Sequence, residues 1–139
     1  MIYRNITFKA APFSYNFEFE DRITLIGGDS GSGKTLFCEK LCEQRIPNVK
    51  VFNYESVNFV KTLSECKNCL VVIDNAACLV TEEVKRLINF NLSNQYVLML
   101  QNCDGLNVSD KSFKILRCVG DVITLADECD TELKAINAF

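Results

Sequence analysis

Apolar and polar side chains alternate strictly near the start of the chain. Apolar side chains occupy every second position from Phe13 to Phe19, and polar side chains lie between them. Residues 2–8 also carry apolar side chains at one parity, and the Ala-Ala-Pro segment 10–12 supplies a bend. A period of two is typical of a strand with one buried and one exposed face. We therefore predict an antiparallel hairpin at the edge of a sheet.

Strands and helices are expected to alternate through the middle of the chain. Short apolar runs at 22–26, 49–54, 69–73 and 96–100 predict buried strands. Helical spacing predicts helices after Thr35, Ser56 and Thr81, the last two residues serving as N-caps. The apolar side chains expected to face inward are Leu36, Phe37, Leu41, Phe59, Val60, Leu63, Val84, Leu87, Ile88 and Leu92. This order favours an α/β fold with a mainly parallel sheet and helices on both faces.

The C-terminal part follows a different pattern. Two apolar runs, 113–119 and 122–126, are separated by Gly-Asp and predict a second antiparallel hairpin. Asp130-Thr131 then predicts the start of a last helix, with Leu133, Ile136 and Phe139 facing inward. A chain of 139 residues without repeats or long linkers is expected to form one domain, 1–139.

A glycine-rich segment between the strand at 22–26 and the following helix predicts a phosphate-binding loop. Its residues fit G-x-x-x-x-G-K-[ST]: Gly28, Asp29, Ser30, Gly31, Ser32, Gly33, Lys34 and Thr35. Glycines allow the backbone N–H groups to converge on phosphate oxygens. The helix that follows, with Leu36 in its first turn, directs the positive end of its dipole to the same phosphate. Lys34 would neutralise phosphate charge, and the Thr35 hydroxyl would help to hold Mg²⁺.

At this motif the chain resembles the P-loop NTPases, whose Walker A motif it matches. The apolar run 70–73 followed by Asp74 is similar to their Walker B motif. The resemblance implies the three-layer P-loop NTPase fold, ATP and Mg²⁺ as cofactors, and a metal held by Thr35 and Asp74.

Asn75 departs from the pattern of many related ATPases, which place a glutamate directly after the aspartate. An amide can position a water molecule but cannot accept its proton. Glu55, at the end of the strand 49–54, is the alternative base by resemblance to RecA-like members, or else a solvated strand-end residue. Gln101 is either a sensor of the γ-phosphate or an ordinary polar residue at a strand exit.

The chain matches the motifs of individual P-loop NTPase groups only in part. The D-x-x-G motif of GTPases is absent after Asp74, so GTP preference is disfavoured. Residues 29–35 after two antiparallel strands look most like the ATP-binding-cassette group. However, no L-S-G-G-Q signature occurs, and the 40 residues between Lys34 and Asp74 leave no room for the insertion that carries it. The chain is therefore expected to be a reduced core of cassette-like or RecA-like type.

Composition indicates where the protein is expected to be located and which partners it is expected to have. The net charge of −3 does not indicate nucleic-acid binding. The N-terminus lacks a signal-peptide pattern and no apolar run could span a bilayer, so we expect a cytoplasmic protein without membrane contact. Eight cysteines without histidine favour reduced, mostly structural thiols over a zinc or redox site at Cys66-x-x-Cys69.

These observations predict that the chain is a small Mg²⁺-dependent ATP-binding protein. Its ATP hydrolysis is expected to be slow and to depend on Lys34, Asp74, Asn75 and Glu55. An alternative is a nucleotide-dependent interaction module with little hydrolysis. A small-molecule or nucleotide kinase ranks last, because segment 101–112 has no arginine to close over phosphates. A homodimer or protein partner could complete the site, with Arg45, Arg86 or Arg117 docking from a second copy.

Overall fold

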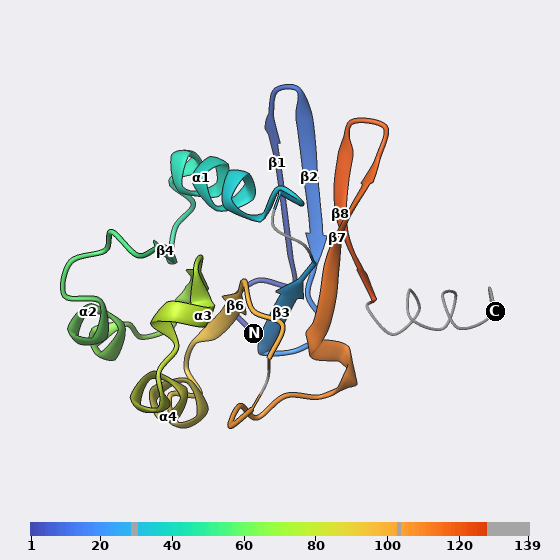
Figure 1. Ribbon diagram of the computed structural model, residues 1–139. Helices are drawn as coiled ribbons and strands as arrows, with labels where there is room; N and C mark the ends of the chain where they lie inside the picture. The colour runs from blue at the N-terminus through green and yellow to red at the C-terminus, as the bar shows by residue number, and fades with distance from the viewer. Residues whose placement is uncertain (29–30, 103, 128–139) are drawn as a thin grey trace.

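The computed structural model describes residues 1–28, 31–102 and 104–127, and all of its strands belong to one sheet (Figure 1). The strands are β1 Asn5–Ala10, β2 Phe13–Glu18, β3 Ile23–Gly27, β4 Val49–Phe52, β5 Leu70–Ile73, β6 Gln95–Leu98, β7 Phe113–Val119 and β8 Val122–Asp127. The helices are α1 Lys34–Gln44, α2 Phe59–Glu65, α3 Ala76–Leu79, α4 Glu82–Phe90 and the 3-10 helix η1 Asp110–Ser112.

The strand order in the sheet is β1-β2-β8-β7-β3-β6-β5-β4. The pairs β4–β5, β5–β6, β6–β3 and β3–β7 are parallel, and β2 also pairs in parallel with β8. β1–β2 and β7–β8 are antiparallel hairpins. The prediction of an N-terminal hairpin at the sheet edge is confirmed, as is the second hairpin, in which Val119 pairs with Val122 around a Gly-Asp turn.

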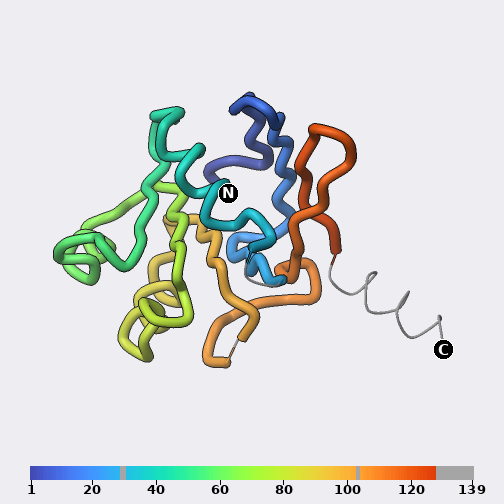
Figure 2. Tube along the Cα trace, turned by 45° about the horizontal axis from the view of Figure 1, so that its top comes forward, coloured from blue at the N-terminus to red at the C-terminus, as the bar shows by residue number. Residues whose placement is uncertain are grey.

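The predicted architecture is wrong. We expected the three layers of the P-loop NTPase fold, with helices over both faces of a mainly parallel sheet. The structure is instead a mixed eight-stranded sheet that curls like half a barrel, with two long hairpins and few, short helices (Figure 2). The right-handed twist of strands, accumulated over eight of them, curls the sheet. One face is therefore covered largely by the hairpins rather than by a layer of helices.

Two apolar clusters bury the central strands on both faces. Alternate residues of β3, β5 and β6 belong to opposite clusters, as Val71 and Val72 of β5 show. One cluster receives side chains from α2, α3 and α4, and the other from α1 and the N-terminal hairpin. Because both faces are covered, these strands consist of continuous apolar runs.

Aromatic side chains connect the N-terminal hairpin to α1. The Phe17 ring of β2 stacks on the Phe37 ring of α1 with centroids 4.3 Å apart, and Tyr15 and Phe8 pack beside them. Phe17 and Phe37 are buried almost completely. The alternating residues that predicted the hairpin therefore hold α1 in place, and the glycine-rich loop lies at the start of this helix.

Several local predictions differ from the structure. Ser56 does not cap a helix, because its hydroxyl accepts a hydrogen bond from the Asn53 N–H, and α2 begins at Phe59 after Asn58. Thr81 does cap α4, accepting from the Val84 N–H at 3.4 Å. Of the side chains expected to face inward, Leu36, Val60 and Leu92 are exposed. The short helix α3 was not predicted, and the expected helix from Asp130 lies outside the described residues.

Candidate functional site

Two loops at one edge of the sheet form the candidate site. β3 leads into the glycine-rich loop, β5 leads to Asp74, and β6 lies between these two strands. The Met99 N–H after β6 donates to the Ile73 carbonyl at 3.0 Å, so the exits of neighbouring strands are aligned. Carboxyl ends of parallel strands share an edge, and this is where open α/β sheets hold ligands. The loop residues and Asp74, widely separated in sequence, therefore meet.

The glycine-rich loop depends on glycine for its backbone conformation. Gly31 and Gly33 have φ values of +87° and +95°, which other residues rarely adopt, and a Cβ at either position would meet nothing within 4 Å. Glycine is needed there for the backbone angle rather than for lack of space. Gly33 directly precedes α1, which begins at Lys34. Asp29 and Ser30 of the predicted loop lie outside the described residues.

Two side chains donate to one carbonyl group at the start of the loop. The Lys34 ammonium donates to the Gly28 oxygen at 2.8 Å, and the Gln101 amide donates to the same oxygen at 3.2 Å. Gly28 itself has a φ of +108°. Gln101 thus joins the glycine-rich loop through a described contact, although it follows β6 by several residues.

A pocket of about 390 Å³ lies against the loop. Its lining comprises Gly31, Gly33, Lys34, Thr35, Asp74, Asn75 and Met99. Asp74 is only 6% exposed, and its Oδ1 accepts the Asn75 N–H at 2.9 Å. Asn75 has a left-handed backbone with φ +53°, and its side-chain oxygen is buried without a hydrogen-bond partner among the described residues. The pocket therefore combines a cationic side chain, a hydroxyl and a buried carboxylate.

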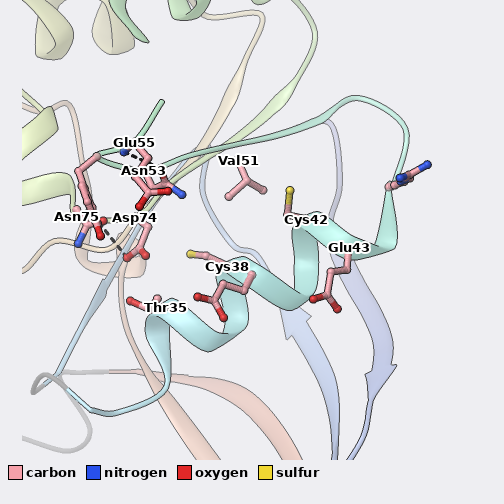
Figure 3. A pocket seen from close by; sticks show the side chains of 12 residues that line it. Thr35, Cys38, Cys42, Glu43, Val51, Asn53, Glu55, Asp74 and Asn75 are labelled. Carbon is pink, nitrogen blue, oxygen red and sulfur yellow. Dashed lines mark hydrogen bonds between the residues drawn. The ribbon is translucent and has the colours of Figure 1, made fainter. Parts of the chain in front are cut away.

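A larger pocket of about 640 Å³ adjoins the first one and shares Thr35, Asp74 and Asn75 with it (Figure 3). It extends along α1 and the end of β4. Its other lining residues are Cys38, Glu39, Cys42, Glu43, Arg45, Val51, Asn53, Tyr54 and Glu55. Glu55 is exposed, and its backbone N–H donates to the Asn53 side chain at 2.8 Å. Glu55 thus lies in the larger pocket and does not line the smaller one.

Burial and charge suppress ionisation of the Cys38 thiol, which lines the larger pocket. Burial raises the pKa of Cys38 strongly, and the negative charge of Asp74 raises it further. Cys38 therefore stays a neutral thiol. Cys66 and Cys69 are free, and each thiol donates to a nearby carbonyl. In the described part of the chain, no three histidine, cysteine, aspartate or glutamate residues gather as metal ligands.

The structure brings together most of the predicted site residues. Lys34, Thr35, Asp74, Asn75 and two glycines line one pocket, and Gly28 and Gln101 are linked to it through Lys34. The Ser32 hydroxyl lies beside Gly28, 3.6 Å from where a Cβ would stand there. Leu36 lines neither pocket and is 37% exposed.

Sequence reasoning missed two groups of lining residues. One is Met99. Its position directly after β6, the strand next to the one that leads to Asp74, could have predicted that it lines the pocket. The other is the face of α1 that lines the larger pocket. The helical spacing of Thr35, Cys38, Glu39 and Cys42 could have predicted this face, because it places them on one side of a helix that starts at the loop. Arg45 was considered for a second copy, but it lies at the far end of this pocket, about 15 Å along the helix from Thr35.

Comparisons of the chain with protein-family models, with curated proteins and with solved structures found no match. Among the helices of residues 1–28, 31–102 and 104–127, none combines the length and apolar character needed to cross a membrane.

Proposed function

We propose that this protein binds a Mg²⁺-nucleoside triphosphate, preferably ATP, at the glycine-rich loop and hydrolyses it slowly. The observation that carries the proposal is that Lys34, Thr35 and Asp74 line one pocket beside glycines with positive φ. The proposal concerns a loop similar to that of the P-loop NTPases and its neighbours, and not their three-layer architecture.

The residues present fit a Mg²⁺ ion that is shared with phosphate. Mg²⁺ commonly takes one or two protein oxygens and completes its octahedron with phosphate oxygens and water. The Thr35 hydroxyl and the Asp74 carboxylate are oxygen ligands in the same pocket, and Asp74 forms no ion pair with a described residue. A bound Mg²⁺ would supply charge neutralisation at the phosphates. Lys34 and the N–H groups that open α1 would bind and orient the phosphate oxygens.

Slow hydrolysis follows from the side chains around the loop. Asn75 can orient a water molecule but cannot remove its proton. Asp74 is assigned to the metal, and Glu55 lines only the larger pocket. General bases contribute about 10²- to 10⁴-fold to rate, so the lack of one among the described residues that line the smaller pocket predicts a low turnover. The same observation favours the second candidate, an interaction module that binds ATP and barely cleaves it.

Calorimetry tests the proposal with the full chain, using ATP, ADP and GTP with and without Mg²⁺. We expect Mg²⁺-assisted ATP binding, and the Lys34→Ala variant should bind at least tenfold more weakly, a difference of about 1.4 kcal/mol. Lys61→Ala is the matched control, because Lys61 is exposed on α2 and lines neither pocket. Equal affinity for ATP in wild type and Lys34→Ala would refute the proposal.

Single-turnover hydrolysis separates the two candidates. A rate above that of ATP in solution supports a slow ATPase, while tight binding with the solution rate supports the interaction module. The free thiols in the described ranges suit a reducing compartment, and we propose the cytoplasm. We also propose that a partner or second copy supplies the missing catalytic group when hydrolysis is required.

A further inference from the structure

We propose that the larger pocket holds an uncharged, polyhydroxylated molecule of sugar size, to which the protein transfers the γ-phosphate of ATP. This transfer rests on the proposed function, because it uses the ATP bound at the glycine-rich loop. The sequence alone ranks a kinase last, since segment 101–112 has no arginine to close over phosphates. The structure supplies another feature that a kinase requires, a pocket for an acceptor beside the phosphates.

The two pockets meet at the residues that we assign to Mg²⁺ and their neighbour. Thr35, Asp74 and Asn75 line both pockets, whereas Lys34 lines only the smaller one. In phosphoryl transfer the metal ion bridges the β- and γ-phosphates, so the shared residues mark the γ-phosphate end of the proposed nucleotide. The larger pocket therefore opens onto the phosphorus atom that is attacked.

A carboxylate lies at this end of the larger pocket. The Asp74 N–H donates to the Phe52 carbonyl at 2.8 Å, so the exits of β5 and β4 are aligned and residues 53–55 follow beside Asp74. In Figure 3 Glu55 lies near Asp74, whereas Glu43 lies further along α1. The Glu55 carboxylate forms no hydrogen bond or ion pair with a described residue. It is therefore available to a ligand that enters the pocket.

Glu55 is placed to act on an acceptor hydroxyl rather than on water in the smaller pocket. The hydroxyl oxygen forms a bond to the γ-phosphorus, while the bond from that phosphorus to the β–γ bridging oxygen breaks. ADP leaves with the electron pair of the broken bond, and the hydroxyl proton passes to the Glu55 carboxylate. With Asp74 assigned to the metal, no described residue of the smaller pocket can take a proton from water. ATP is then hydrolysed slowly until an acceptor binds.

The lining of the larger pocket indicates the class of acceptor. Its volume of about 640 Å³ is within the range of about 300–1,000 Å³ that is usual for small-molecule pockets. The side-chain oxygens of Glu39, Glu43 and Asn53 can accept hydrogen bonds from hydroxyl groups. Val51 and the neutral thiol of Cys38 offer apolar surface to C–H groups. Carboxylates outnumber the single guanidinium of the lining, which disfavours a phosphorylated or carboxylated acceptor.

Phosphate transfer from radiolabelled Mg²⁺-ATP to D-ribose, D-glucose and glycerol, each added to the full chain, tests the proposal. We expect a phosphate ester of at least one of them, formed at least tenfold faster than phosphate is released without an acceptor. Glu55→Gln should lower the rate of transfer at least a hundredfold, because a general base contributes about 10²- to 10⁴-fold. Glu65→Gln, at an exposed position of α2 outside both pockets, is the control and should stay within twofold.

The kinetic parameters distinguish a base from a residue that only supports the pocket. Glu55→Gln should act mainly on kcat, whereas Glu43→Gln should raise the KM for the acceptor more than it lowers kcat. An effect of Glu55→Gln on KM alone, or an equal loss in Glu65→Gln, would contradict the role of Glu55. If Mg²⁺-ATP binds but none of the three acceptors is phosphorylated, the acceptor site is refuted and the proposed function stands. If ATP does not bind, the proposed function fails as well.

Thiol alkylation measures binding of the acceptor without nucleotide. Cys42 is exposed and lines the larger pocket, whereas Cys118 is exposed on β7 outside both pockets. The acceptor that is phosphorylated should slow maleimide alkylation of Cys42 at least threefold and leave Cys118 unchanged, as measured by peptide mass spectrometry. An unchanged rate at Cys42, or equal slowing at both thiols, would show that the acceptor does not occupy this pocket.

Discussion

Lys34 and Gln101 donate hydrogen bonds to the same carbonyl oxygen, that of Gly28. The Nζ–O distance is 2.8 Å and the Nε2–O distance is 3.2 Å. One donor opens α1 and the other follows β6, so the contact closes the glycine-rich loop from both sides. The Lys34 ammonium has two further N–H donors for a phosphate, and Gln101 keeps the Gly28 oxygen paired when Lys34 turns away from it.

We predict that Gln101→Ala weakens Mg²⁺-ATP binding by about threefold, because one neutral hydrogen bond contributes roughly 0.5–1.5 kcal/mol net. Calorimetry measures the effect. Gln44→Ala is a suitable control, since the Gln44 amide donates to the Lys40 carbonyl on the helix surface, with no other hydrogen bond to a described residue. A loss of thirtyfold or more would show that Gln101 contacts the nucleotide directly, and unchanged affinity would show that its bond to Gly28 has no effect.

Glu55→Gln should leave single-turnover ATP hydrolysis within twofold of wild type, because Glu55 lines only the larger pocket. Asp74→Asn serves as the positive control and should raise the Mg²⁺ concentration needed for ATP binding, since it removes a charged oxygen ligand. A fall of tenfold or more in Glu55→Gln would contradict this expectation and identify Glu55 as the general base.

Phe17→Ala should lower the free energy of unfolding by about 3–5 kcal/mol, because it removes a buried ring that stacks on Phe37 of α1. Urea denaturation measures the change. Phe90→Ala is the matched control: Phe90 is 81% exposed, and its loss should change stability by less than about 0.5 kcal/mol. Similar losses in both variants would mean that the aromatic cluster does not hold the hairpin to α1.

Asp21 should stabilise the fold only where it is ionised. Its carboxylate accepts the hydroxyls of Ser109 at 2.7 Å and Ser112 at 3.0 Å and the N–H of Arg22 at 2.7 Å. Burial raises the pKa of Asp21, but these hydrogen bonds outweigh burial and lower the pKa below its ordinary value of 3.8. A lowered pKa in the folded state means stabilisation that is complete above pH 3.8 and is lost as the pH falls through the folded value.

We therefore predict that Asp21→Ala is about 1.5 kcal/mol less stable than wild type at neutral pH, and that the difference shrinks as the pH falls below 3.8. Urea denaturation over a pH series measures it, and Asp121→Asn, at an exposed hairpin turn, is the control. A difference that is constant or grows at low pH would contradict the assignment of these hydrogen bonds.

Most strands could be predicted because their patterns are local. Alternation in β2 and continuous apolar runs in β5 and β6 depend on which face of a strand is buried, and neighbouring residues report that directly. The end of α4 was predicted less well. Leu92 continues the helical spacing of Val84 and Ile88, yet α4 ends at Phe90 and Leu92 is exposed. Spacing alone does not reveal where a helix leaves the core.

By itself, the sequence determined the candidate residues of the proposed phosphate and metal site, because glycine backbone freedom, the Lys34 ammonium and the Thr35 hydroxyl follow from the order of residue types. It also placed Asp74 at the end of a buried strand. Only the tertiary structure decided how the sheet curls, that the N-terminal hairpin rather than helices covers α1, and that acidic residues of α1 share a pocket with Asp74. These outcomes depend on strand order and on packing between distant segments, which no local pattern encodes.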